Sequence, residues 1–196
     1  MRLRRVKNVI CFVIMGCIIF SNVICVKAAD RICWNKKMNH GGSICYWVSS
    51  DVIYTSNIRD AEIEIEIPAA GYKNSMKMSK TTEKKQSQID FYQYSDANSS
   101  TVAATYSYLA GSQTPMYVSD KDNYDWQWCK VELNKALINQ KTYAGRTVTC
   151  VHEMLHAFGG KDTYSSDQKW SIMYGYSSRT ATGVTSDANA FLNEKY

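Results

Sequence analysis

The segment 152–162, with the sequence HEMLHAFGGKD, constrains this chain more than any other stretch. Apolar residues recur at helical spacing before and within it, namely Val148, Val151, Leu155 and Phe158. This pattern predicts a helix with one apolar face. Residues four apart lie on the same side of a helix, so His152 and His156 would project together and could bind one metal ion. The alternative interpretation is an ordinary amphipathic helix with two histidines on its polar face.

Three further residues of the segment extend the metal hypothesis. Glu153 is rotated by about 100° from the first histidine around the helix axis. This position suits a general base that reaches a metal-bound water rather than the metal itself. Gly159 would end the helix, because glycine tolerates a positive φ and lets the chain turn back. Asp162 would then supply the third ligand, and Asp167, five residues further on, is the competing candidate.

The extended motif, followed by Ser171-Ile172-Met173-Tyr174, resembles the metzincin clan of zinc metallopeptidases. Met173 matches the methionine of the tight turn beneath the metal, in a context similar to matrixins and to small secreted peptidases of the snapalysin type. The resemblance implies an α+β fold: a single metzincin-like domain with a mixed twisted sheet, an active-site helix, a Met-turn and a C-terminal helix. Asp162 departs from the commonest metzincin pattern, which has histidine there, but agrees with snapalysin-like enzymes.

The resemblance and the candidate residues together predict a zinc-dependent endopeptidase. His152, His156 and Asp162 would hold Zn²⁺, while Glu153 would activate a zinc-bound water for attack on a peptide bond. Matrixins also suggest Ca²⁺, although no local run of carboxylates identifies a site. The alternative function is a secreted zinc-containing binding or structural module without catalysis. Glu153 favours the enzyme, because an inactive clamp has little need of this residue.

Two tyrosines lie close to the predicted Met-turn. In some metzincins a tyrosine two residues after the methionine contacts zinc, but that position is Gly175 here. Tyr174 and Tyr176 flank the position without matching it. We therefore assign neither tyrosine a catalytic role.

The N-terminal sequence is typical of a signal peptide. Basic residues precede an apolar run over about 9–26. We predict removal of residues 1–28 and a secreted, extracellular metallopeptidase domain over 29–196, with a membrane anchor as the alternative. The leader holds five of the 23 basic residues, so the mature domain would carry as many basic as acidic residues, 18 of each. This neutral balance gives no support for binding to nucleic acid or to a membrane surface.

Four cysteines remain after the predicted cleavage: Cys33, Cys45, Cys129 and Cys150. An even number in an oxidising compartment predicts two disulfide bonds. Three connectivities are open. We favour Cys33–Cys45, because its loop is short, and this leaves Cys129 to pair with Cys150.

The remaining chain reads as one domain with several short elements. Strand-like patterns occur at 45–48, 88–94 and 101–109, and the last of these is a candidate edge strand. If the resemblance holds, this edge would bind an extended peptide substrate by strand addition. Short helices are predicted around 135–138 and over 186–196, the latter with a capping serine. We expect a monomer.

Two stretches are harder to assign. In 60–67, glutamate alternates with isoleucine as in a strand with one solvated face, whereas the family would place its first helix near here. The polar stretch 73–88 is interpreted as a loop or a surface helix.

Overall fold

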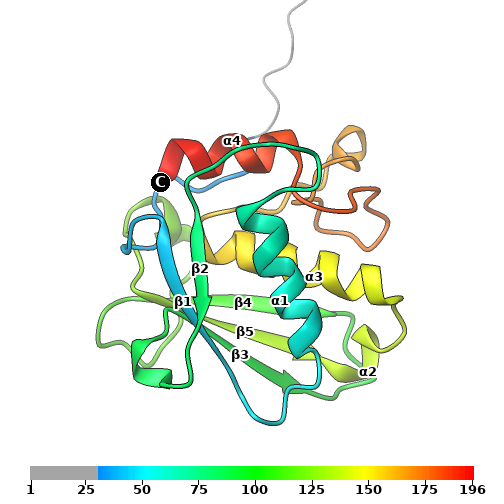
Figure 1. The fold of residues 1–196 in the computed structure, drawn as a ribbon, viewed down its shortest axis with the longest axis horizontal. Helices are drawn as coiled ribbons and strands as arrows, with labels where there is room; N and C mark the ends of the chain where they lie inside the picture. The colour runs from blue at the N-terminus through cyan, green and yellow to red at the C-terminus, as the bar shows by residue number, and fades with distance from the viewer. Residues whose placement is uncertain (1–30) are drawn as a thin grey trace, which may run out of the picture.

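Five strands form one mixed sheet in the computed structural model, which describes residues 31–196 (Figure 1). The strands are β1 (Ser43–Val48), β2 (Lys77–Lys80), β3 (Ile89–Tyr94), β4 (Ala103–Tyr108) and β5 (Trp128–Asn134). Their order is β2-β1-β3-β5-β4, and only the β4–β5 pairing is antiparallel. β4 is therefore an edge strand, as predicted for the 101–109 stretch. The predicted signal peptide, residues 1–28, lies outside the described residues.

Four α-helices accompany the sheet within the described residues, which together form a single α+β domain. They are α1 (Thr55–Glu66), α2 (Lys135–Ile138), α3 (Tyr143–Ala157) and α4 (Ser186–Lys195). Three short 3₁₀ helices are η1 (Lys84–Gln86), η2 (Val118–Asp122) and η3 (Ser166–Gln168). Figure 1 shows α3 running alongside the sheet, and α1 lies beside α3. Helix α4 lies near the end of α1 that points away from the sheet. Nowhere in 31–196 is a helix both long and apolar enough to span a membrane.

The predicted helix of the histidine motif is α3. Thr142 caps its first turn, since the threonine hydroxyl accepts a hydrogen bond from the Gly145 N–H at 3.1 Å. The predicted apolar face is buried at Val151 and Leu155, and each such side chain contributes about 1.5–3 kcal/mol to the free energy of unfolding. The Trp126 indole donates to the last carbonyl of α3, at Ala157, over 2.8 Å. Both ends of α3 are thus held in place.

The 60–67 stretch lies in α1, so its interpretation as a strand face is wrong. Ile58, Ala61 and Ile65 follow helical spacing and are fully buried. Ile63 and Ile67, which belong to the apparent alternation, are 47% and 70% exposed. The alternation was coincidental, and the helix implied by the resemblance is present.

The 73–88 stretch contains a strand that the sequence did not indicate. β2 pairs in parallel with β1 at the other edge of the sheet. It has only four residues, of which Met78 alone is buried. A short polar edge strand leaves almost no alternation to detect.

The C-terminal helix α4 is present as predicted, but its N-cap residue differs from the predicted serine. Thr185 rather than Ser186 precedes the helix, and its side chain makes no capping hydrogen bond. Ala188, Phe191 and Leu192 bury the inner face of α4 in the core. The helix is therefore held by packing rather than by its cap.

The predicted disulfide bonds are absent from the structure: Cys33, Cys45, Cys129 and Cys150 are all free thiols. Cys129 Sγ lies 4.0 Å from the Ala157 carbonyl. Cys150 stands two helical turns earlier on α3, roughly 10 Å away along the axis. Cys45 instead faces Ser79 on β2, with 3.4 Å between Sγ and Oγ. The backbone of Cys33 forms an isolated antiparallel bridge with Gly160. The pairs Cys33–Cys45 and Cys129–Cys150 were wrong because the fold places their members beside other partners.

Candidate metal centre

Helix α3 and the turn after it bring three predicted ligands together. The Nε2 atoms of His152 and His156 are 3.1 Å apart. Asp162 Oδ1 lies 3.2 Å from Nε2 of His152 and 3.4 Å from Nε2 of His156. These residues form a group whose ligand atoms all lie within 4.8 Å of one another, and it does not include Asp167. Residues 31–196 contain no second such group of three His, Cys, Asp or Glu, so the predicted Ca²⁺ gains no support.

Two consecutive glycines turn the chain back so that Asp162 reaches the histidines. Gly159 has φ of +111°, the left-handed conformation that its sequence position predicted. The Gly160 N–H then donates to the Leu155 carbonyl at 2.8 Å and closes the helix. A Cβ on Gly160 would lie 2.8 Å from Met173 Cε, so the methionine packs directly against this turn. The buried Met173 thus supports the turn that delivers the third ligand.

Backbone carbonyls fix the orientation of both imidazoles. His152 Nδ1 lies 2.7 Å from the Ile172 carbonyl and His156 Nδ1 lies 2.9 Å from the Gly160 carbonyl. Because a carbonyl only accepts, both contacts assign the ring proton to Nδ1 and leave the Nε2 lone pair facing the group. Asp162 Oδ1 is buried there without a hydrogen-bond partner. Three converging electron-pair donors repel one another unless a cation lies between them, so this arrangement fits a metal ion.

The charges of the three residues are strongly coupled. Burial alone would raise the pKa of Asp162, but the two imidazoles hold it well below its ordinary value. Burial and the neighbouring His156 lower the pKa of His152. Burial also acts to lower the pKa of His156, yet the adjacent Asp162 carboxylate raises it overall. The ionised Asp162 and the His152 imidazole, which resists protonation, are two of the deprotonated ligands that metal binding requires, whereas a metal ion would compete with a proton for His156.

Glu153 is buried next to the ligand group without belonging to it. Thr105, on the edge strand β4, places its hydroxyl 2.7 Å from Glu153 Oε2 and 2.9 Å from the Glu153 carbonyl. The hydroxyl can donate to the carboxylate and hold one of its two oxygens. Sequence reasoning missed Thr105, because nothing in the motif indicates which residue of a distant strand meets the glutamate.

The ligand group and Glu153 line a cleft of about 1020 Å³. Its walls come from α3, from the segment 100–105 that includes the start of β4, and from the segment 175–182. The edge strand therefore borders the same space as the predicted ligands. A chain of extended backbone could lie along this border within reach of Glu153.

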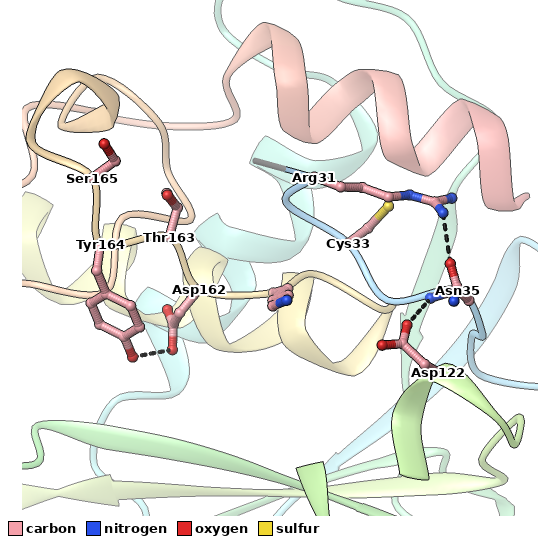
Figure 2. A pocket seen from close by; sticks show the side chains of 9 residues that line it. Arg31, Cys33, Asn35, Asp122, Asp162, Thr163, Tyr164 and Ser165 are labelled. Carbon is pink, nitrogen blue, oxygen red and sulfur yellow. Dashed lines mark hydrogen bonds between the residues drawn. The ribbon is translucent and has the colours of Figure 1, made fainter. Parts of the chain in front are cut away.

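Tyr164 is a second residue that sequence reasoning missed. Figure 2 shows its hydroxyl directed at Asp162, where it donates to Oδ2 at 3.2 Å. Its ring also packs against Tyr176, with 5.1 Å between centroids, whereas Tyr174 is buried. A Cβ on Gly175 would lie 2.5 Å from the Tyr164 ring, so this glycine makes room for the tyrosine. Tyr164 thus orients the third ligand, and within 31–196 no hydrogen bond joins the hydroxyl of Tyr174 or Tyr176 to it.

No model of a known protein family matches this chain, and comparison with curated proteins gives no match either. The function must therefore be argued from the site itself.

Proposed function

We propose that this protein is a zinc-dependent endopeptidase of the metzincin type. One observation carries the proposal: ligand atoms of one buried and two half-buried residues converge in a cleft, and a fourth polar side chain, the buried Glu153, lies beside them outside the ligand set. Imidazole nitrogens and carboxylate oxygens are both common ligands of Zn²⁺ in proteins, so this set of three suits that ion. Three protein ligands, rather than four, are typical of catalytic zinc sites, which keep one position open.

The residues divide the chemistry between them. A bound Zn²⁺ would lower the pKa of a water molecule and polarise the substrate carbonyl. His152, His156 and Asp162 would hold the ion, with the imidazoles oriented by backbone carbonyls. Glu153 would take the proton of the attacking water and pass it to the leaving amine. Because Thr105 engages Oε2, the other oxygen of Glu153 is left to accept that proton.

The edge strand supports an extended substrate. β4 pairs with β5 on one side only, so the start of its other side offers backbone N–H and C=O groups, whereas the Ser107 carbonyl already accepts from the Met116 N–H. Ala103, Ala104 and Thr105 border the cleft. A peptide added there as a further strand would pass next to Glu153.

Secretion of the protein as a monomeric domain over 29–196 also belongs to this proposal. Its support is the basic and apolar N-terminal sequence, which is typical of a signal peptide.

The variant Glu153→Ala tests the proposed mechanism. It should keep its bound zinc, because Glu153 is not a ligand, and lose hydrolysis of casein. Glu83→Ala, at an exposed glutamate outside the cleft, is the matched control and should retain full activity. Turnover by Glu153→Ala at the wild-type rate would refute the assigned base. Zinc binding by the wild type without any chelator-sensitive hydrolysis would instead favour a non-catalytic binding or structural module.

A further inference from the structure

The cleft carries positive charge that the proposed peptidase reaction does not use. Four basic residues line it: Lys121, Lys141, Lys161 and Arg179. Within 31–196 none of the four forms an ion pair with a carboxylate. The lining holds only two carboxylates, Glu153 and Asp162, and both already have roles at the metal centre. The cleft is thus positive, although basic and acidic residues balance over 29–196.

Arg179 is anchored beside the first metal ligand. Its Nη1 donates to the Ile172 carbonyl at 3.1 Å, the same oxygen that lies 2.7 Å from His152 Nδ1. No other protein acceptor in the described part of the chain hydrogen-bonds to this guanidinium. Burial lowers its pKa, which the carboxylates of Glu153 and Asp162 oppose, but an arginine stays charged at neutral pH. Arg179 therefore presents a fixed cation with unused donors close to the candidate reaction centre.

Lys141 is a second cation of the cleft lining, and it is near enough to Arg179 for the two charges to interact. It directly precedes the N-cap of α3. Burial lowers the pKa of Lys141, and the charge of Arg179 lowers it further, so the two cations act on each other. The lining of the cleft also includes small and apolar residues from the same segments of the chain, among them Ala144, Val148 and Ala181. Two like charges in a partly dry space are unfavourable unless an anion lies near both.

We propose that Arg179 and Lys141, together called the cationic end of the cleft, bind a carboxylate of the substrate at a residue adjoining the scissile bond. The preferred substrates are then peptides with an acidic group at that place. This inference rests on the proposed peptidase function. The carboxylate has two sources, namely an aspartate or glutamate side chain, or the C-terminal carboxylate of a peptide. A guanidinium with free donors suits a carboxylate from either source, because its fork geometry matches the two oxygens.

Matched peptides test the substrate class. Peptides that differ only in Glu, Gln or Lys at each position flanking the scissile bond should show kcat/KM higher for Glu than for Gln by on the order of tenfold or more, with Lys the slowest. A preference that survives C-terminal amidation identifies a side chain as the source. A preference confined to a free C-terminal carboxylate, and lost on amidation, identifies the terminus. Equal kcat/KM for all acidic and neutral peptides would overturn the proposal.

Variants assign the preference to the cationic end. Lys141→Gln and Arg179→Gln should each reduce the ratio of kcat/KM for Glu over Gln, and Lys141→Glu should shift the preference towards Lys. Arg59→Gln, at an exposed arginine of α1 outside the cleft, is the matched control and should leave the ratio unchanged. If Arg179→Gln slows the Glu and Gln peptides by the same factor, Arg179 acts on the chemistry and the proposal is overturned. In the described part of the chain no hydrogen bond or ion pair joins Lys141 to the metal centre, so its variants keep the test valid even if Arg179→Gln does not fold.

A binding measurement separates this inference from the proposed function. The zinc-loaded Glu153→Gln variant should bind the Glu peptide more tightly than the Gln peptide in isothermal titration, and the added Lys141→Gln change should weaken that difference. If no peptide is hydrolysed but this Lys141-dependent binding occurs, the peptidase function fails and the carboxylate site stands. If neutral peptides are hydrolysed without any acidic preference, the carboxylate site fails and the peptidase function stands.

Discussion

The two ends of the cleft hold charge in opposite ways. At the metal end, Asp162 faces two imidazoles whose remaining nitrogens are bound to carbonyls. At the cationic end, the charge of Arg179 acts on Lys141, and neither residue forms an ion pair with a carboxylate, as far as the described chain extends. The donor atoms of the first end suit a cation, and the charges of the second suit an anion.

This contrast indicates which ligand each end requires. At the metal end, the lone pairs of two imidazole nitrogens and a buried carboxylate oxygen attract a small ion of high charge density. At the cationic end, two long cationic side chains in a cleft that also holds small apolar residues suit a larger organic anion, such as a carboxylate on a peptide. A peptide with a carboxylate next to a polarised carbonyl would satisfy both ends at once.

The largest effect is expected on zinc affinity, from the loss of a ligand at the metal end. Asp162→Ala removes the ligand that closes the group, so the affinity for Zn²⁺ should fall by more than the roughly 10- to 100-fold typical of changes to residues behind the ligands. Competition with a chromogenic chelator measures the affinity, and hydrolysis should disappear with the metal. Asp167→Ala serves as the control and should bind zinc as the wild type does. The reverse result would make Asp167 the third ligand.

The metal end could be predicted from the sequence because its geometry is local. The histidine spacing fixes both side chains on one face of α3, and Gly159 predicts the turn that returns Asp162 to them. Met173 required a resemblance to a known family, since a lone methionine is usually a core filler. In the structure, Met173 Cε lies against the turn at Gly160.

The errors concern contacts between distant parts of the chain. The cysteine pairs depended on which residues face each other across the fold, and Cys129 meets Ala157 rather than Cys150. The strand interpretation of 60–67 failed because a local alternation was overridden by packing of the other face of α1 against α3. Thr105 and the cationic end were missed for the same reason, since each joins segments that spacing alone cannot place together.

A smaller effect sharpens the description of the metal end. Thr105→Val removes the hydroxyl that holds Glu153 Oε2 while keeping the shape of the side chain. The rate of hydrolysis should fall by about tenfold, because a hydrogen bond to a charged group contributes roughly 1.5–3 kcal/mol and water replaces part of it. Zinc affinity should not change. Thr105→Ser restores a hydroxyl and should recover most of the rate, and failure of this rescue would show that Thr105 acts only by packing.

The smallest effect is expected on stability, and it tests whether the charge of Lys141 destabilises the protein when no substrate is bound. Lys141→Gln should raise the free energy of unfolding of the protein without substrate, by less than about 1 kcal/mol because solvent screens a partly exposed charge. The sign follows from the lowered pKa of Lys141, which means that the charged form favours the unfolded chain. The gain should therefore be complete at neutral pH and vanish as the pH rises above the unfolded value near 10.4. Urea unfolding at pH 7 and at pH 11 measures it, and a loss of stability at pH 7 would mean that Lys141 already has a stabilising partner within the protein.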